Sequence, residues 1–279
     1  MTTTQHTSRV SAVLATAKAE GRSAFVGYLP VGYPDVDTSI EAMVTMVRSG
    51  VDIVEIGLPY TDPLMDGPVI QTAATGALAA GVHVRDVFRA AEAITAAGGA
   101  CVVMTYWNPV LRYGVDAFAR DLAASGASGL ITPDLVPDEA GEWITASEAH
   151  DLDRIFLVAP SSTPERLAMT TAASRGFVYA AALMGVTGAR SAVSGEAAVL
   201  VERVREISDI PVCVGLGVST AEQAREVAGF ADGVIVGSAL VSTLVEADNA
   251  KDGLAQLART ATALADGVRG RASNRSSAG

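Results

Sequence analysis

The sequence predicts a (β/α)8 barrel, a TIM-barrel arrangement, with one extra helix at the N-terminus. Three observations predict it. Eight short β-rich runs alternate with amphipathic, alanine-rich segments along the 279 residues. The runs are almost continuously apolar, which is typical of a parallel sheet covered on both faces. Eight such units in roughly 250 residues is the usual size of this barrel. A doubly wound open sheet is the alternative.

The predicted elements follow one another without a linker. The strands are expected at residues 24–28, 53–56, 100–104, 129–131, 154–158, 177–180, 212–215 and 234–236. Helices are expected at 10–20, 37–49, 69–80, 84–97, 115–125, 138–149, 164–174, 195–207, 220–228, 238–247 and 252–266. We therefore expect one domain over residues 1–268 and a disordered polar tail at 269–279.

Composition and charge exclude several functional classes. The chain is 49% hydrophobic and 18% charged, which suits a large folded core. Its net charge of −11 argues against a nucleic-acid partner. The uncharged stretch 93–111 contains Gly98 and Pro109, so we expect no membrane span there.

The cysteines and the first residues indicate a cytoplasmic protein. Cys101 and Cys213 lie in apolar runs, without a Cys or His at metal-ligand spacing, which favours buried free thiols in a reducing compartment. The N-terminal sequence MTTTQHTSRV lacks the basic and apolar regions of a signal peptide. No metal site is expected.

Glu55 is a carboxylate inside the second expected strand, in VDIVEIG. Burying a carboxylate without a partner is costly, so it either forms a buried salt bridge or faces the mouth of the barrel. Active sites of such barrels lie at the C-terminal ends of the strands. Burial there would raise the pKa of Glu55 toward neutrality and make it a general acid and base.

Two more carboxylates, Asp62 and Asp66, lie in the loop that follows this strand. Pro59, Pro63 and Pro68 restrict the conformations of that loop. Asp66 is either a functional group at the barrel mouth or an ordinary turn or N-cap residue before the next helix.

Glycine-containing turns follow the last three strands and favour a phosphate site. Their sequences are GVTGARSAVSG (185–195), GLGVST (215–220) and VGSAL (236–240). Glycine permits close backbone approach, and the N–H groups at a helix start attract anions. Ordinary tight turns are the alternative. The first turn is also rich in small residues, which suits either a mobile lid or a plain connection.

Aromatic and apolar side chains near the strand ends are candidates for a pocket lining. For Phe25 and Met104, a place in the barrel core is an equal alternative. A buried tyrosine needs a partner for its hydroxyl, which favours the pocket mouth. The other candidates are Tyr28, Tyr106, Ile131 and Tyr179.

The segment VEIGLPYTDPLMDGPVIQ (54–71) closely resembles the hallmark segment of the tryptophan synthase alpha subunit family. The resemblance covers nearly the whole chain in order. Its other segments are FVGYLPVGYPD (25–35), MTYWNPVLRYG (104–114), TPDLVPDEA (132–140), IFLVAPSSTPERL (155–167), GVTGAR (185–190), VGLGVST (214–220) and DGVIVGSAL (232–240).

The resemblance implies a lyase that cleaves indole-3-glycerol phosphate into indole and glyceraldehyde 3-phosphate by a retro-aldol reaction. Glu55 would handle protons at indole C3 and at the glycerol hydroxyl, and Asp66 would hold the indole N–H. The implied substrate-binding residues are Tyr28, Tyr106, Ile131, Tyr179 and Thr187. The implied phosphate-binding residues are Gly188, Gly217, Gly237 and Ser238.

The resemblance also implies a partner, a beta subunit that receives indole through a tunnel, in an alpha2-beta2 complex. Pyridoxal phosphate is expected only in that subunit, and no cofactor is expected in this chain. Pro59, Asp62 and Asn108 match positions at the subunit contact.

Three other functions remain open at this point. They are a stand-alone lyase that releases free indole, a non-catalytic activator of a beta subunit, and another phosphate-binding barrel such as a sugar-phosphate isomerase. A sugar-phosphate isomerase or similar barrel would leave the loop from Asp62 to Asp66 unexplained.

Overall fold

The structure, a computed structural model, describes residues 8–181, 190–215 and 217–270. Its strands form one parallel sheet in the order β5-β4-β3-β2-β1-β9-β8-β7-β6. Their bounds are β1 (Ala24–Pro30), β2 (Ile53–Gly57), β3 (Ala100–Met104), β4 (Gly129–Ile131), β5 (Asp153–Ile155), β6 (Leu157–Val158), β7 (Val178–Ala181), β8 (Val212–Gly215) and β9 (Gly233–Val236).

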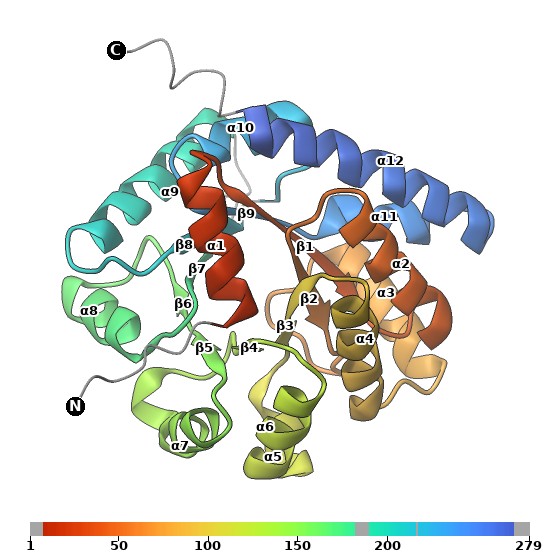
Figure 1. The fold of residues 1–279 in the computed structure, drawn as a ribbon, viewed down its shortest axis with the longest axis horizontal. Coiled ribbons are helices and arrows are strands. Elements are labelled where there is room, and N and C mark those ends of the chain that lie inside the picture. The colour runs from red at the N-terminus through yellow and green to blue at the C-terminus, as the bar shows by residue number, and fades with distance from the viewer. Residues whose placement is uncertain (1–7, 182–189, 216, 271–279) are drawn as a thin grey trace.

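The sheet closes into a barrel because β5 and β6 are two parts of one expected strand. β5 pairs with β4, and β6 pairs with β7. Between them, the carbonyl of Phe156 still accepts a hydrogen bond of 3.1 Å from the N–H of Tyr179. The (β/α)8 prediction is confirmed, and the doubly wound alternative is wrong because this sheet is a ring, with helices around it (Figure 1).

Helices cover the outside of the ring and one of its ends. Their bounds are α1 (Arg9–Ala19), α2 (Val36–Arg48), α3 (Pro68–Ala79), α4 (Val84–Ala96), α5 (Trp107–Tyr113), α6 (Val115–Ala124), α7 (Gly141–Ala149), α8 (Pro164–Ala173), α9 (Arg190–Arg205), α10 (Ala221–Ala228), α11 (Ser238–Val245) and α12 (Ala250–Arg269), with a 3-10 turn η1 (Pro137–Glu139). None of the helices described is long and apolar enough to cross a membrane.

Successive residues of each strand enter two different apolar clusters. Phe25 and Val54 pack in the outer cluster, between the sheet and its helices, whereas Val26 and Ile53 pack in the inner cluster, inside the barrel. Each strand is therefore buried on both sides, which explains its continuously apolar sequence. The two cysteines also lie in different clusters, Cys101 in the outer one and Cys213 in the inner one. Both are free and buried.

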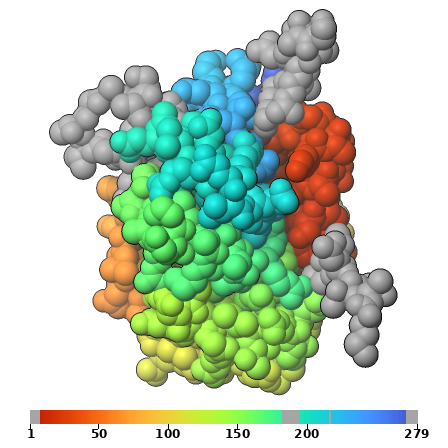
Figure 2. Space-filling model, turned by 90° about the vertical axis from the view of Figure 1, so that its left-hand side faces the viewer, coloured from red at the N-terminus to blue at the C-terminus, as the bar shows by residue number. Residues whose placement is uncertain are grey.

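Helix α1 closes the N-terminal end of the barrel. Its buried side chains Val10, Leu14 and Ala17 belong to the inner cluster. In Figure 2 the red of α1 and the orange of the segment around α3, which follows the C-terminal end of β2, lie on opposite sides of the molecule. The open end is therefore the C-terminal end of the strands.

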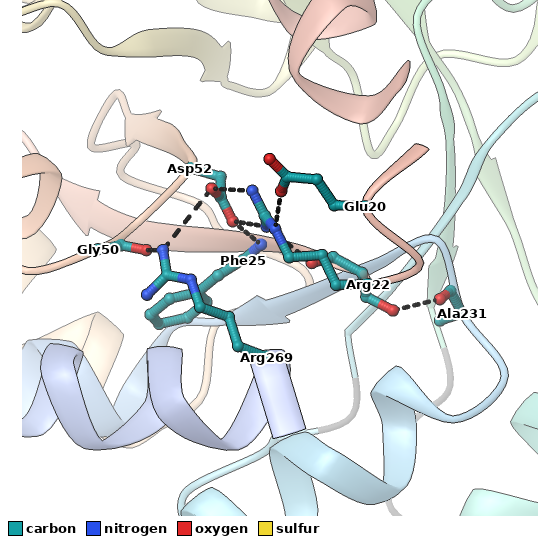
Figure 3. A network of polar contacts seen from close by, with 8 residues as sticks. Glu20, Arg22, Phe25, Gly50, Asp52, Ala231 and Arg269 are labelled. Atoms are coloured by element: carbon teal, nitrogen blue, oxygen red, sulfur yellow. Dashed lines mark hydrogen bonds and ion pairs between the residues drawn. The ribbon is translucent and has the colours of Figure 1, made fainter. Parts of the chain in front are cut away.

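A polar network ties the two ends of the fold together beside α1 (Figure 3). Arg22 donates hydrogen bonds of 2.8 and 3.1 Å to the two carboxylate oxygens of Asp52, which also accepts one of 2.8 Å from the N–H of Phe25. Arg269, the last residue of α12, donates to the carbonyl of Gly50 at 2.8 Å. These bonds join the start of β1, the turn before β2 and the end of the last helix.

Several expectations about the helices need correction, and the helix expected from residue 138 is a 3-10 turn, η1, followed by α7 from Gly141. Helix α5 was not predicted, because Asn108-Pro109 is typical of a loop; Pro109 lies in the first turn of α5, where its missing N–H costs no hydrogen bond. Helix α9 begins at Arg190, before the expected residue 195. Helix α12 continues to Arg269, past the expected end at 266, and residues 271–279 of the expected tail lie outside the described residues.

Candidate active site

A cavity of about 310 Å³ opens at the C-terminal ends of the strands. The strand residues that line it belong to the set whose side chains point inward, such as Glu55 in β2 and Tyr179 in β7. Its described lining is Tyr28, Glu55, Met65, Asp66, Gly67, Ile70, Met104, Tyr179, Ala181, Gly215, Gly217, Ile235, Gly237 and Ser238.

Glu55 is buried in the wall of this cavity, with 1% of its surface exposed. It lies beside Tyr28 in the β1–β2 register and beside Val102 in the β2–β3 register. Within the described part of the chain no salt bridge reaches it, and its Oε2 has no hydrogen-bond partner. Burial raises the pKa of Glu55 to about 8. The salt-bridge interpretation is therefore not supported, and the carboxyl group is a usable acid at neutral pH.

Asp66 lines the same cavity from the loop between β2 and α3. Its backbone carbonyl accepts a hydrogen bond of 2.8 Å from the Gln71 side chain, and its carboxylate accepts one of 3.4 Å from the Tyr106 hydroxyl. The N-cap of α3 is Gly67, without a side-chain hydrogen bond, so Asp66 is not the capping residue. Burial raises the pKa of Asp66, and the bond from Tyr106 lowers it.

Tyr28 and Tyr179 lie beside the two carboxyl groups in the cavity lining, and these four residues are called the acidic wall below. Burial raises the pKa of Tyr28 well above its usual value, and the negative charges of Asp66 and Glu55 add to this. Burial, and then the charge of Glu55, raise the pKa of Tyr179 in the same way. Both hydroxyl groups therefore stay protonated at neutral pH and are neutral hydrogen-bond donors.

Two glycines make room for these tyrosine rings. A Cβ at Gly57 would lie 2.4 Å from the Tyr28 hydroxyl oxygen, and a Cβ at Gly215 would lie 2.6 Å from that of Tyr179. Any side chain at either position would push a ring into the cavity or out of it. The width of the cavity thus depends on glycine at both strand ends.

The opposite side of the cavity is neutral and rich in backbone donors. Gly217, Gly237 and Ser238 line it, and none of the described lining residues is Lys or Arg. Helix α11 begins at Ser238, and its N-cap Gly237 makes no side-chain capping bond. The first N–H groups of α11 thus have no side-chain acceptor from the N-cap, which suits a bound anion.

Two of the other predicted substrate residues, Ile131 and Tyr106, are absent from the described lining of the cavity. Ile131 is fully buried in the inner cluster and does not line the cavity. Tyr106 is not part of the described lining either, because its hydroxyl is bonded to the loop that carries Asp66. Thr187 and Gly188 lie outside the described residues.

Sequence reasoning missed several residues that line the cavity. Ile235 is one of them, and the alternation of inward and outward residues along β9 would have identified it. Met65, Gly67 and Ile70 come from the loop and from the start of α3, where no periodic pattern indicates the direction of a side chain.

The three predicted interface residues lie around the same rim. Asp62 and Asn108 are exposed, whereas Pro59 is buried within the chain. The Asn108 side chain donates to the Tyr60 hydroxyl at 3.4 Å, which connects the start of α5 with the Asp66 loop.

Comparison with known proteins identifies the family. A family model described as tryptophan synthase alpha chain matches residues 14–269. This chain belongs to the tryptophan synthase alpha chain family. It is 66% identical over 265 residues to the tryptophan synthase alpha chain of Mycolicibacterium paratuberculosis, covering 95% of this chain and 96% of that one. The alpha chain of Mycobacterium tuberculosis H37Ra is 63% identical over 262 residues, covering 94% and 95%.

Solved structures agree with this assignment. The structure of Mycobacterium tuberculosis tryptophan synthase in space group F222 is similar with a TM-score of 0.87 and 62% identity, over 94% of this chain and 98% of that one. The match to the tryptophan synthase alpha chain model contains every strand of the barrel, so both carboxylates and the glycine turns lie within it.

Proposed function

We propose that this chain is the alpha subunit of a tryptophan synthase and cleaves indole-3-glycerol phosphate into indole and glyceraldehyde 3-phosphate. One observation carries the proposal. Glu55, a buried carboxyl group that has no charged partner among the described residues, lines the same cavity as a second carboxylate, Asp66, and a helix N-terminus suited to phosphate, at Ser238. Family membership supports it.

The reaction needs one group that first gives and then takes a proton. Protonated Glu55 donates its proton to indole C3, and Asp66 stabilises the resulting positive charge by accepting a hydrogen bond from the indole N–H. Glu55, now a carboxylate, takes the proton of the hydroxyl on the carbon attached to C3. As that carbon becomes an aldehyde, the carbon–carbon bond breaks, and its electron pair restores the aromatic ring.

Burial of Glu55 suits both steps. With a pKa near 8 the group holds its proton at neutral pH, and the carboxylate it forms is a stronger base than an exposed one. No electron sink other than the protonated indole ring is needed, which agrees with a family that carries no cofactor. Pyridoxal phosphate is expected in the beta partner.

The substrate would span the cavity from the acidic wall to the start of α11. We propose that Tyr28 and Tyr179 contact the indole end, and that Gly217, Gly237 and Ser238 hold the phosphate through N–H and hydroxyl donors. Thr187 and Gly188, in the connection between β7 and α9, remain part of the proposal as closing and phosphate residues.

The beta subunit would dock on the rim of the open end. Exposed apolar side chains there, Leu64 (79% exposed), Leu111 (48%) and Val136 (42%), accompany the proposed contact residues Asp62 and Asn108. An exposed apolar patch marks a protein contact, and we propose that these three side chains belong to one such docking surface. Pro59 would act by shaping the loop beneath them.

Two further assignments belong to this proposal. Both cysteines are free thiols, which suits a reducing, cytoplasmic location. Residues 1–268 would form one domain, because β1 must pair with β9 to close the ring.

Indole release from indole-3-glycerol phosphate, with and without the cognate beta subunit, tests the function. Slow release by the chain alone and much faster release with the partner is the expected result. Fast release that does not respond to the partner would indicate a stand-alone lyase. No release in either case would leave the non-catalytic activator or another phosphate-binding barrel.

Asp66→Asn is expected to keep the fold and lose most of the turnover, about a hundredfold, because a neutral amide stabilises the protonated indole less. The measurement is kcat with the beta subunit present. Asp248→Asn is the matched control for loss of charge, since Asp248 is exposed between α11 and α12 and is not part of the described cavity lining. Unchanged kinetics for Asp66→Asn would make Asp66 an ordinary turn residue.

A further inference from the structure

The hydroxyl group of Tyr106 is bonded to three consecutive residues of the Asp66 loop. It accepts hydrogen bonds from the N–H of Leu64 at 2.8 Å and from the N–H of Met65 at 3.0 Å. It donates to Oδ1 of Asp66 at 3.4 Å. A phenolic hydroxyl has one hydrogen and two lone pairs, so its whole bonding capacity is used by this loop.

The tyrosine itself is held firmly. It is 5% exposed, and its ring packs on Tyr60 with the ring centroids 5.2 Å apart. The next residue, Trp107, begins α5, and its N–H donates to both carboxylate oxygens of Asp134, at 2.9 and 3.1 Å. A buried ring at the start of a capped helix is a rigid support for a hydrogen bond.

The stretch from Leu64 to Asp66, in contrast, has few other hydrogen bonds among the described residues. Leu64 is 79% exposed, and Met65 is 37% exposed. Beyond the Tyr106 hydroxyl, Gln71 is the described side chain that holds the Asp66 backbone, through the carbonyl group. The direction of the Asp66 carboxylate therefore depends on Tyr106.

We propose that Tyr106 is a positioning residue that holds the Asp66 carboxylate toward the cavity and keeps its loop in place. The inference rests on the proposed role of Asp66. It replaces the substrate contact predicted for Tyr106, since this residue is absent from the described lining of the cavity.

Removing the hydroxyl also has a consequence for pH dependence. The charge of Asp66 acts on Tyr28 from β1, and the Tyr106 hydroxyl, from the turn after β3, is bonded to Asp66. Glu55 from β2 lines the same cavity. Burial raises the pKa of Asp66, and the Tyr106 bond opposes this. Without that bond the pKa of Asp66 rises further, so the acidic limb of kcat/KM moves to higher pH.

The test is Tyr106→Phe in the full-length chain with its beta subunit. We expect kcat to fall roughly ten- to a hundredfold, as for a catalytic group displaced by about an ångström, with a much smaller change in KM. Tyr113→Phe is the matched control. Its hydroxyl donates to Asp121 at the surface at 2.6 Å, so its kinetics should not change. Thermal unfolding of both variants verifies the fold.

A double variant separates positioning from direct contact. In an Asp66→Asn background, Tyr106→Phe should cost much less than in the wild type, because the carboxylate it positions is gone. An equal loss in both backgrounds would overturn the proposal and indicate a direct contact with substrate. Full activity of Asp66→Asn alone would instead refute the proposed function of that residue.

Hydrogen exchange provides a readout independent of activity. The amides of Leu64 and Met65 should exchange faster in Tyr106→Phe than in Tyr113→Phe, since they lose their acceptor. Unchanged exchange together with unchanged kcat would also overturn the proposal.

Discussion

Glu55→Gln is expected to lower the rate of indole release by about a thousandfold, the range of a lost general acid and base. Glutamine has the shape of glutamate, but it neither donates a proton to carbon nor takes one from a hydroxyl. Because Oε2 of Glu55 has no hydrogen-bond partner among the described residues, changing that atom breaks no hydrogen bond within the described part of the chain. The measurement is kcat with the beta subunit bound, with inorganic phosphate binding as the test of an intact site.

Glu92→Gln is the matched control, since Glu92 is exposed on α4, away from the cavity lining. It should be as active as the wild type. Comparable turnover by Glu55→Gln would refute the acid–base assignment. Loss of both turnover and phosphate binding would point instead to a disturbed cavity.

The same substitution is expected to change the pH dependence of stability. Burial raises the pKa of Glu55 from 4.5 to about 8, so between these values the folded chain keeps a proton that the unfolded chain releases. Raising the pH through this window therefore favours unfolding, by about 1.4 kcal/mol for each pH unit. The contribution of Glu55 to the free energy of unfolding is fully present below pH 4.5 and is lost completely above about pH 8.

Glu55→Gln lacks this titration, so the stability difference between variant and wild type should grow in favour of the variant by a few kcal/mol from pH 4.5 to 8. Denaturant unfolding of the isolated chain at several pH values, without substrate, measures it. Parallel stability curves for the two proteins would show that Glu55 is ionised in the folded state, and so is not the acid of the first step.

The positions of the strands followed from composition because each strand is buried on both sides. Phe25 and Val26 face different clusters, yet both must be apolar, and this produces a run that is easy to recognise. The interruption at Phe156 was not predictable. It depends on the strand changing its hydrogen-bonded neighbour from β4 to β7, which no local sequence feature encodes.

The candidate site was predictable where the chemistry of one residue is unusual in its surroundings. Glu55 was identified because a carboxylate buried in an apolar strand is costly and is therefore rarely found without a function. The placement of Tyr106 was not, because its partner Asp66 lies 40 residues away in the sequence, in a loop without periodicity. An aromatic residue near a strand end is equally compatible with a pocket and with a loop anchor.

Helix α1 makes the two ends of the barrel different, because its side chains Val10, Leu14 and Ala17 fill the N-terminal end. Below Glu55 the inner cluster fills the barrel, and in the described part of the chain it leaves a reactant no passage through the N-terminal end. The substrate and both products therefore pass through the same opening, at the C-terminal end of the strands. A partner bound at that rim would therefore affect both the entry of substrate and the release of products.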